Sequence, residues 1–357
     1  MKILTVLGAR PQFIKSATVS RACQAAGITE IIVHTGQHFD KNMSDVFFKE
    51  MEIPPPHYNL EINCLGHGAM TGRMLERIEE VLVKEKPDYV LVYGDTNSTL
   101  AGAMAAAKLH IPVAHIEAGL RSFDMNMPEE INRILTDRIS KFLFCPTETA
   151  VRNLIKEGFH DFDCKIEQPG DVMYDAVLFY REKAAQASTI LSTQSLTING
   201  FVLATLHRAE NTDDPQRLRS ICEALNKIHE SLPVILPLHP RTKMYLQSQQ
   251  IPLNVRLVEP VGYFDMLSLL ENCELVLTDS GGLQKEAYFF SKYSITLRDQ
   301  TEWTELVAAR CNSIAGASTD KILSTFNHLR SKKMPPTEAL YGKGNAARLI
   351  VDALIKS

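Results

Sequence analysis

The sequence predicts an α/β protein with two Rossmann-like, doubly wound domains that face each other across a cleft. Short apolar runs rich in β-branched residues alternate with longer segments of helical period along the whole chain. This βαβ rhythm is typical of parallel sheets covered by helices on both faces. The chain has 357 residues, which exceeds one ordinary domain of roughly 100 to 200 residues and indicates two.

The first domain, residues 1–175, is expected to contain five strands in succession. They span residues 3–7, 30–35, 89–93, 112–116 and 142–145. Between the third and the fourth strand lies the alanine-rich segment 100–109, which has the length and composition of a helix. A strand, a helix and a further strand in this order predict neighbouring parallel strands.

The second domain, residues 176–343, repeats the pattern after a break. Residues 181–200 are rich in Ser, Thr, Gln and Ala without a strong period, and we interpret them as the region between the domains. Strands then resume at residues 201–206, 234–238, 255–259, 274–278 and 294–297. Ligands of open α/β sheets bind beyond the carboxyl ends of the strands, so the loops that follow the strands are expected to line the cleft.

The composition is that of a soluble globular protein, with 45% apolar and 22% charged residues. The net charge of −4, from 38 basic and 42 acidic side chains, argues against a nucleic-acid partner. No run approaches the ~18 apolar residues of a membrane-spanning helix, and the N-terminus reads as a first strand. The seven cysteines are widely spread without a C-x-x-C pair, which disfavours zinc or disulfides and favours a cytoplasmic protein.

Seven predicted strand-end loops carry charged or hydrogen-bonding groups. They are GARPQFIK (8–15), TGQH (35–38), GDTNST (94–99), EAGLR (117–121), HRAEN (207–211), HPR (239–241) and DSGGLQKEA (279–287). Each loop alone also fits a solvated turn or a capped helix start, and Asp95 and Asp279 are candidates for simple N-caps. Seven such loops on one predicted rim favour a site.

The loop DSGGLQKEA favours a phosphate ligand. A strand ends there in Ser280, Gly281 and Gly282, and a helix begins. Glycines let a ligand approach the backbone closely, while the free N–H groups and the dipole at the helix start suit an anion. The loop matches neither a P-loop nor a G-x-G-x-x-G fingerprint. Glu286, about one turn into the helix, is a candidate to bind ribose hydroxyls; the alternative is a surface carboxylate.

Acidic side chains and a histidine follow other strands. Asp95 ends one strand and Glu117 the next, so the two carboxylates are expected only several ångströms apart if the strands are neighbours, as a general acid and base require. Glu129 follows a proline, where starting a helix is the alternative role. His207 is a candidate to donate a proton or bind a diphosphate, or else a structural histidine. A strand-to-loop break separates the two histidines of HTGQH (34–38), so we expect no metal site.

Taken in order, these motifs resemble the non-hydrolysing UDP-N-acetylglucosamine 2-epimerase family. The matching segments are GARPQFIK, TGQH, YGDTNSTLAGA, HIEAGLRS with MPEEINR, the HR after a strand, LTDSGGLQKEA and LRDQTEW. They cover essentially the whole chain. The resemblance implies a GT-B-like fold in which a last helix, at about 344–357, returns to the first domain. It also implies a UDP-sugar substrate, no cofactor and a homodimer.

The resemblance implies roles for individual residues. The catalytic set would be Asp95, Glu117, Glu129, His207 and Lys15. The substrate and its UDP would be bound by Arg10, His239, Ser280, Gly281, Gly282, Glu286 and Arg298. Three further residues match parts of a regulatory UDP-sugar site in the family, namely Gln37, His38 and Arg208.

Some segments differ from the housekeeping enzymes of the family. Gln12 and Ala209 stand where those enzymes typically have Glu and Arg. At these places the chain looks most like the subgroup that epimerises UDP-2,3-diacetamido-2,3-dideoxy-D-glucuronate for surface polysaccharide such as O-antigen. An uncharged Gln12 near the sugar would suit a substrate with an added carboxylate, because like charges repel. The alternatives are a UDP-GlcNAc 2-epimerase, a hydrolysing relative, a GT-B glycosyltransferase and a sensor without turnover.

The chemistry of the sugar predicts an elimination. No carbonyl acidifies the C2 proton of a 2-acetamido sugar, so direct deprotonation would be slow. Loss of UDP from C1 as the proton leaves C2 gives a glycal, and re-addition with protonation on the other face gives the epimer. We expect Asp95 and Glu117 to transfer the protons, in an order that the sequence leaves open. Arg10, the helix start at 280–282 and His207 would clamp the diphosphate, with help from Lys15.

Overall fold

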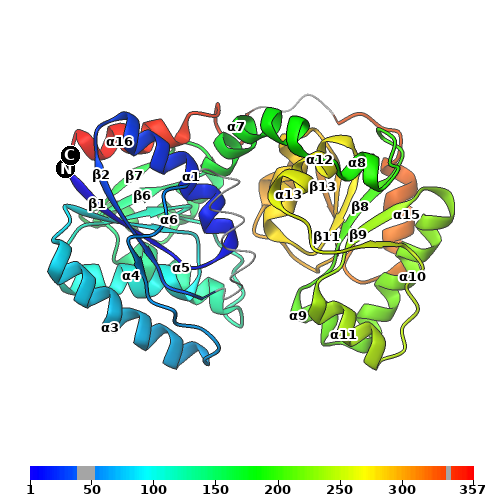
Figure 1. Cartoon of the computed structure of the whole chain (residues 1–357), viewed down its shortest axis with the longest axis horizontal. Helices are drawn as coiled ribbons and strands as arrows, with labels where there is room; N and C mark the ends of the chain where they lie inside the picture. Colours follow the sequence, from blue (N-terminus) through cyan, green and yellow to red (C-terminus); the bar gives the residue numbers. More distant parts are fainter. Residues whose placement is uncertain (38–52, 335–338) are drawn as a thin grey trace. The chain divides into compact units, whose positions relative to one another are not determined.

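A computed structural model describes residues 1–37, 53–334 and 339–357, and the chain divides into two compact α/β units (Figure 1). Unit 1 comprises Met1–Leu178 and Ala339–Ser357, and unit 2 comprises Phe179–Glu338. Each unit holds one parallel sheet with helices around it. The predicted fold class, two doubly wound α/β domains, is confirmed.

The sheet of unit 1 has seven parallel strands in the order β3-β2-β1-β4-β5-β6-β7. They are β1 (Lys2–Leu7), β2 (Thr29–His34), β3 (Tyr58–Asn59), β4 (Tyr89–Tyr93), β5 (Val113–Ile116), β6 (Phe142–Phe144) and β7 (Lys165–Glu167). The strand order reverses between β1 and β4. Such a switch point leaves a crevice at the carboxyl ends of the two strands, where ligands of doubly wound sheets bind.

Helices cover both faces of this sheet. They are α1 (Arg10–Ala25), α3 (His67–Glu85), α4 (Asn97–Lys108), α5 (Pro128–Arg138), α6 (Glu148–Lys156), the short 3₁₀ helix η1 (Phe159–Asp161) and α16 (Ala346–Ile355). Helix α4 approaches the sheet closely because its buried residues from Ala101 to Ala106 are all Ala or Gly. A Cβ on Gly102 would lie 3.0 Å from Val6, so a larger residue there would push the helix away.

The C-terminal helix α16 belongs to unit 1, where it packs against α1 (Figure 1). The carboxylate of Asp175 accepts hydrogen bonds from the backbone N–H groups of Ala346 and Ala347, at 3.1 and 2.8 Å. Asp175 lies on α7 (Val172–Ala187), the helix within which unit 1 passes into unit 2. The first turn of α16 is therefore bound to the start of α7, which satisfies two N–H groups that a helix start leaves open.

The sheet of unit 2 has six parallel strands in the order β10-β9-β8-β11-β12-β13. They are β8 (Val202–Thr205), β9 (Val234–Pro237), β10 (Arg256–Val258), β11 (Val276–Thr278), β12 (Ser294–Thr296) and β13 (Asn312–Ile314). The helices are α8 (Ile190–Thr193), α9 (Ala209–Thr212), α10 (Pro215–Ser231), α11 (Pro240–Ser248), α12 (Tyr263–Asn272), α13 (Gly281–Phe289), α14 (Thr304–Ala308) and α15 (Thr319–Leu329). Counted from its first strand, this sheet has the strand order of unit 1 without the last strand.

Three strands differ from the expectation because the sequence gives little sign of them. Strands β3, β7 and β13 are two or three residues long and lie at the edges of the sheets. Their sequences, YN, KIE and NSI, contain polar side chains that face solvent or the sheet rim. Edge strands need only one pairing partner and one buried face, so they lack the continuous apolar run that identifies the central strands.

Residues 181–200 also differ from the expectation, because they lie within unit 2 rather than between the units. Residues 181–187 continue helix α7, in which Ala184 is buried, and Ile190 is buried in α8. The hydroxyl of Ser188 donates a hydrogen bond to Asp265 at 2.6 Å. Only a few positions of this Ser- and Gln-rich stretch face the core, which is too few to produce a visible period.

In the described part of the chain, no helix combines the length and the apolar character needed to cross a membrane. All seven cysteines are free thiols. Burial raises the pKa of Cys23 and of Cys222 to about 12, so these two thiols stay protonated and unreactive near neutral pH.

Candidate functional site

The polar loops of unit 1 gather at the carboxyl ends of β4 and β5, which are adjacent parallel strands. Their register runs from Val90 beside Val113 to Tyr93 beside Ile116. Asp95 and Glu117 follow the two strands at the same edge of the sheet. The condition on which the predicted acid and base pair depended, that the two strands are neighbours, is therefore met.

Glu117 is buried and pairs with Lys15. The Nζ atom of Lys15, on α1, contacts Oε2 of Glu117, and the two residues are 9% and 6% exposed. Glu117 has a φ of +72°, a left-handed conformation that costs a non-glycine residue of order 1 kcal/mol or more. The Glu117 N–H donates a hydrogen bond to the Phe144 carbonyl at 3.1 Å. Strained backbone of this kind concentrates at functional sites.

Gly94, the residue before Asp95, makes room for the carboxylate of Glu117. A Cβ on Gly94 would lie 3.3 Å from Oε2 of Glu117 and 3.7 Å from Nζ of Lys15, and Gly94 has a φ of +63°. Both the conformation and the close approach suit glycine. The buried ion pair thus packs over the peptide that leads into Asp95.

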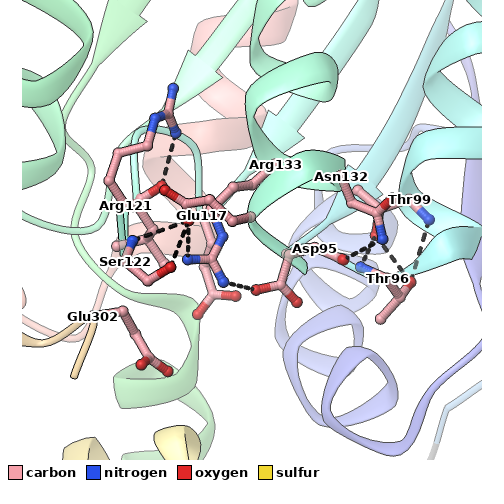
Figure 2. A network of polar contacts seen from close by, with 12 residues as sticks. Asp95, Thr96, Thr99, Glu117, Arg121, Ser122, Asn132, Arg133 and Glu302 are labelled. Carbon is pink, nitrogen blue, oxygen red and sulfur yellow. Dashed lines mark hydrogen bonds and ion pairs between the residues drawn. The ribbon is translucent and has the colours of Figure 1, made fainter. Parts of the chain in front are cut away.

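Asp95 is the more exposed of the two carboxylates and is held by α5. Arg133 donates to its Oδ2 at 2.5 Å, and the Asp95 side chain keeps 32% of its surface exposed. The amide of Asn132 donates to the Asp95 carbonyl at 2.9 Å. Figure 2 shows Arg133 pointing toward Asp95, with Asn132 on the other side of it. A partly exposed carboxylate held in one orientation is suited to exchanging a proton with a ligand.

Glu130 has a structural role. Its carboxylate accepts from the backbone N–H groups of Ser122 and Phe123, at 2.9 and 2.8 Å, and pairs with Arg133 at 2.8 Å. It is 1% exposed. Glu130 therefore fixes both the loop after β5 and the arginine that holds Asp95. Its neighbour Glu129 is only partly buried on the first turn of α5.

Asp95 is not the N-cap of α4. That position belongs to Thr96, whose side chain accepts from the Thr99 backbone N–H. Figure 2 shows Thr96 and Thr99 next to each other at the start of this helix. Asp95 therefore does not cap α4, and the simple N-cap interpretation of Asp95 is wrong.

Gln12, expected near the sugar, is held by hydrogen bonds within unit 1. Gln12 is 1% exposed. Its Oε1 accepts from the N–H groups of Gly8 and Ala9 at 2.8 and 3.0 Å, and its Nε2 donates to the Tyr93 carbonyl at 2.8 Å. A glutamate could accept the first two bonds but could not donate the third. Gln12 therefore joins the start of α1 to the end of β4 and has no hydrogen-bonding group left for a ligand.

Gly8 is required by packing within unit 1. A Cβ on Gly8 would lie 2.0 Å from Oγ of Ser98 and 2.3 Å from Oγ1 of Thr35, which are themselves hydrogen-bonded at 2.8 Å. Gln37 completes this group, because its Oε1 accepts from the Ser98 hydroxyl at 2.7 Å. Gln37, a predicted regulatory residue, thus stabilises the first turn of α4.

Two predicted site residues of unit 1 lie partly or wholly outside the described part of the structure. Arg10 begins α1, but its side chain is outside the described part of the structure. His38 lies in residues 38–52, which are outside the described residues. The ligand-binding role of Arg10 and the regulatory role of His38 stay predictions.

The corresponding position in unit 2 holds an aspartate that binds His207. Asp279, which follows β11, is fully buried and accepts from the backbone N–H groups of His207 and Arg208 at 3.0 and 2.9 Å. Its Oδ1 also lies 3.4 Å from Nδ1 of His207. The His207 side chain is 41% exposed. Asp279 thus fixes the backbone and one ring nitrogen of a histidine that is accessible to a ligand.

The helix α13 begins directly after this aspartate. Its N-cap, Ser280, makes no capping bond with its side chain, and the carboxylate of Asp279 binds the loop after β8, so the N-cap interpretation of Asp279 is wrong as well. Gly281 and Gly282 form the first turn, and Glu286 is 6% exposed further along the helix. Backbone N–H groups at such a helix start suit an anionic ligand.

Glu302 packs against this helix start. A Cβ on Gly281 would lie 2.1 Å from Oε1 of Glu302. Arg298, which is 3% exposed, pairs with Glu302 at 3.0 Å. By contrast, a Cβ on Gly282 would have nothing within 4 Å. The two glycines therefore differ, because only the first is required by packing against the protein itself.

His239 and Arg208 have additional structural contacts. His239 is exposed and caps α11, with its Nδ1 accepting from the Arg241 N–H at 3.2 Å. The Arg208 backbone binds Asp279, as described above. These contacts leave the predicted ligand-binding role of His239 and the regulatory role of Arg208 as predictions.

Sequence reasoning missed Arg133 and Asp279 as parts of the site. Both lie in motifs that were noted, MPEEINR and DSGGLQKEA. The signal for Arg133 was its position one helical turn after Glu129 and Glu130. The signal for Asp279 was an acidic residue at the end of an apolar strand, where a carboxylate without a partner would be costly.

Within residues 1–37, 53–334 and 339–357, no group of three or more His, Cys, Asp or Glu side chains is arranged to hold a metal ion. The strand ends carry carboxylates, a histidine, buried cations and helix N–H groups. Such groups can transfer protons and stabilise a phosphate, which defines a class of enzymes that act on phosphorylated ligands.

Comparison with known proteins defines the class further. The family model of UDP-N-acetylglucosamine 2-epimerase matches residues 21–355. A relative from Pseudomonas aeruginosa, UDP-2,3-diacetamido-2,3-dideoxy-D-glucuronate 2-epimerase, is 56% identical over 358 residues, which cover all of both chains.

Two solved structures are similar over 100% of both chains. UDP-GlcNAc 2-epimerase from Methanocaldococcus jannaschii, in complex with UDP-GlcNAc and UDP, is 43% identical with a TM-score of 0.93. The enzyme from Neisseria meningitidis bound to UDP-GlcNAc is 34% identical with a TM-score of 0.90. The present chain belongs to the UDP-N-acetylglucosamine 2-epimerase family and is an enzyme of the UDP-sugar 2-epimerase class. The resemblance in the sequence motifs is confirmed, and so is the GT-B-like fold class.

Proposed function

We propose that the protein converts UDP-2,3-diacetamido-2,3-dideoxy-D-glucuronate to its manno epimer at C2 without hydrolysing it. The observation that carries this proposal is the identity of 56% over the full length to the Pseudomonas aeruginosa enzyme of that name. The relatives named as UDP-N-acetylglucosamine 2-epimerases from Methanocaldococcus jannaschii and Escherichia coli are 43% and 34% identical. The proposed substrate follows this difference in identity and no longer depends on Gln12.

The carboxylates of unit 1 carry the proton transfers in this proposal. UDP leaves from C1 as the C2 proton is removed, and the resulting glycal is protonated on the opposite face of C2 before UDP adds again. Glu117, paired with Lys15 and largely buried, and Asp95, held by Arg133 and partly exposed, stand in two different environments. Different environments separate the proton affinities of two carboxyl groups, as an acid and a base acting in turn require. Glu129 is the third carboxylate of the proposed catalytic set.

The loops of unit 2 hold UDP in this proposal. The N–H groups at Ser280, Gly281 and Gly282 bind the diphosphate, and Glu286 binds the ribose. His207 stabilises the charge that develops on the diphosphate as the C1–O bond breaks, with its ring oriented by Asp279 at 3.4 Å. Arg10, Arg298 and His239 complete the proposed binding set.

Incubation of the enzyme with the UDP-sugar in deuterated water tests the reaction. Non-hydrolysing epimerisation through a glycal places deuterium at C2 of both epimers while the UDP linkage survives. Accumulation of free UDP and the manno sugar would instead identify a hydrolysing enzyme. Absence of label without an added acceptor, followed by sugar transfer when one is supplied, would identify a glycosyltransferase.

A direct competition tests the substrate. Equal concentrations of the 2,3-diacetamido uronate substrate and UDP-GlcNAc are supplied together, and the two rates of deuterium incorporation are compared. We expect a higher kcat/KM for the uronate. A higher kcat/KM for UDP-GlcNAc would replace the proposed substrate by the one present in two of the similar structures.

We further propose that the enzyme works as a cytoplasmic homodimer and supplies a sugar for surface polysaccharide such as O-antigen. The seven free cysteines support a reducing compartment. Light scattering of the purified full chain tests the dimer, and deletion of the gene followed by analysis of surface polysaccharide tests the role. A monomer at micromolar concentration, or unchanged polysaccharide, would contradict the respective part.

A further inference from the structure

A buried cluster of charged side chains lies directly behind the two carboxylates Asp95 and Glu117. Its centre is His115 on β5 and Asp137 on α5, both with fully buried side chains, whose Nδ1 and Oδ1 atoms are 2.7 Å apart. Arg121 donates to Oδ2 of Asp137 at 2.7 Å and forms a two-point pair with Glu157, at 2.7 and 2.8 Å. The catalytic assignments above leave all four residues without a role.

Both ring nitrogens of His115 face acceptors. Nδ1 faces the carboxylate of Asp137, and Nε2 lies 2.7 Å from the carbonyl oxygen of Gly94. A carbonyl oxygen only accepts hydrogen bonds, so Nε2 must carry a hydrogen. Nδ1 then carries one too if Asp137 is an anion, because a neutral imidazole has only one N–H group.

Three donors converge on Asp137 and favour its anionic form. Besides His115 and Arg121, the backbone N–H of Gly119 donates to Oδ2 at 3.1 Å. Arg121 and Gly119 bind Asp137 independently of the imidazole, and the pKa of Asp137, which burial raises and its hydrogen bonds and ion pairs lower, lies below its ordinary value of 3.8. Cys145, directly after β6, also faces this group and is neutral, because burial and the charge of Asp137 raise the pKa of its thiol well above the usual range.

The cluster binds the two peptides that adjoin the reacting carboxylates. Gly94, whose carbonyl is the acceptor for His115, immediately precedes Asp95. Gly119, whose N–H binds Asp137, follows Glu117 by two residues, in the loop that holds the strained backbone of Glu117. One imidazole and one carboxylate therefore join the loops after β4 and β5.

We propose that His115 is a buried imidazolium which, together with Asp137, positions Asp95 and Glu117 for proton transfer. Neither residue touches the reacting atoms, so both are positioning residues, and their effect on turnover rests on the proposed epimerase function. The charged groups that face the pair are Arg121 from the loop after β5 and, through it, Glu157 at the end of α6.

The protonation state is tested first, on the wild-type full-length protein labelled with ¹⁵N-histidine. Two-bond ¹H–¹⁵N spectra distinguish an imidazolium from the two neutral tautomers, and the His115 signals are assigned by their absence in His115→Gln. We expect both ring nitrogens of His115 to carry hydrogens at neutral pH. A single N–H at this pH would overturn the proposal, whatever the activity of the enzyme.

The positioning role is tested with Asp137→Asn, His115→Gln and the control Glu157→Gln. Glu157 lies at the outer, partly exposed end of the same cluster, with 33% of its side chain exposed. We expect kcat to fall about 100-fold in the first two variants, with KM changed less than threefold, and less than threefold in the control. Equal losses in all three variants, or turnover retained in the first two, would overturn the positioning role.

The pH profile separates this role from a general loss of stability. His115→Gln removes a cation and leaves Asp137 charged, whereas Asp137→Asn removes the anion, so the acid limbs of kcat in the two variants are expected to move in opposite directions. Identical limbs in both variants would overturn the proposal. If the wild-type enzyme exchanges no hydrogen at C2, the proposed function fails, and the ¹⁵N spectrum still decides the state of His115.

Discussion

The two units share one strand order but place different polar groups at the ends of their strands. In each unit an aspartate follows the strand beyond the switch point, Asp95 after β4 and Asp279 after β11. Asp95 keeps 32% of its side chain exposed and binds an arginine, whereas Asp279 is fully buried and binds the backbone N–H groups of the loop after β8. At equivalent positions, Asp95 therefore stays accessible to a ligand, whereas Asp279 holds a loop in place.

The difference extends to the charges around these residues. Unit 1 pairs its carboxylates with buried cations, Lys15 with Glu117 and Arg133 with Asp95. Unit 2 instead offers backbone N–H groups at a glycine start of α13 and an exposed His207. Buried ion pairs fix proton donors and acceptors in place, while helix N–H groups bind anions without a fixed side chain. The residues at the strand ends, and not the fold, therefore set what each unit can bind or react with.

The largest effects are expected from the reacting carboxylates of unit 1. Asp95→Asn and Glu117→Gln should each lower kcat by about 10²- to 10⁴-fold, because each removes a general acid or base. The dissociation constant of UDP should stay within threefold, since the UDP-binding loops are assigned to unit 2. Steady-state kinetics and calorimetric titration with UDP measure both quantities. The exposed Glu76→Gln on α3 is the matched control, and unchanged kcat in Asp95→Asn or Glu117→Gln would remove that residue from the catalytic set.

A smaller effect is expected from the equivalent aspartate of unit 2. Asp279→Asn keeps one acceptor oxygen but places an amide against the N–H groups of His207 and Arg208, so the loop and the imidazole lose their orientation. We expect kcat to fall about 10- to 100-fold and the thermal midpoint of unit 2 to decrease. Normal kcat with a lowered midpoint would show that Asp279 only stabilises the loop.

UDP affinity should depend on Glu286 in unit 2. Glu286→Ala should weaken UDP binding about tenfold or more, because a hydrogen bond to a charged group contributes about 1.5 to 3 kcal/mol. The exposed Glu230→Ala at the end of α10 is the control in the same unit. Calorimetric titration gives the dissociation constants, and equal values for the two variants would exclude Glu286 from the nucleotide site.

The two glycines of α13 separate packing from ligand binding. Gly281→Ala places a methyl group 2.1 Å from Oε1 of Glu302 and disturbs its pair with Arg298. A cost of about 1 kcal/mol would lower the thermal midpoint of unit 2 by about 2 to 4 °C. Gly282→Ala meets nothing within 4 Å and should leave the midpoint unchanged or raise it, because Ala favours a helix. If UDP binds more weakly to Gly282→Ala, the loss comes from a clash between the added methyl group and the phosphate, and not from packing within the protein.

The smallest effect concerns the acid stability of unit 1. The folded-state pKa of Asp137 lies below its ordinary value of 3.8, so its ion pairs stabilise the fold fully above about pH 4. This stabilisation disappears as the pH falls through the folded-state pKa. We expect Asp137→Asn to be less stable than wild type at pH 6 and the difference to shrink toward pH 2.5. Urea unfolding followed across this range measures it, and a constant difference would contradict the assigned shift.

The sequence by itself determined the parallel sheets, the strand-end loops and the family. Central strands such as β1 and β4 are buried on both faces, so they appear as continuous apolar runs, and the motifs that follow them keep their order along the chain. The sequence did not predict the edge strands β3, β7 and β13, because they are short and partly polar.

Only the tertiary structure decided what each polar residue does. Gln12 and Asp95 both stand in predicted strand-end loops, yet the amide of Gln12 binds three backbone groups while the Asp95 carboxylate remains partly exposed. His115 and Asp137 are 22 residues apart in the chain and become partners only because β5 and α5 pack together. Packing determines which residues distant in sequence become hydrogen-bond partners, so a local sequence pattern cannot predict them.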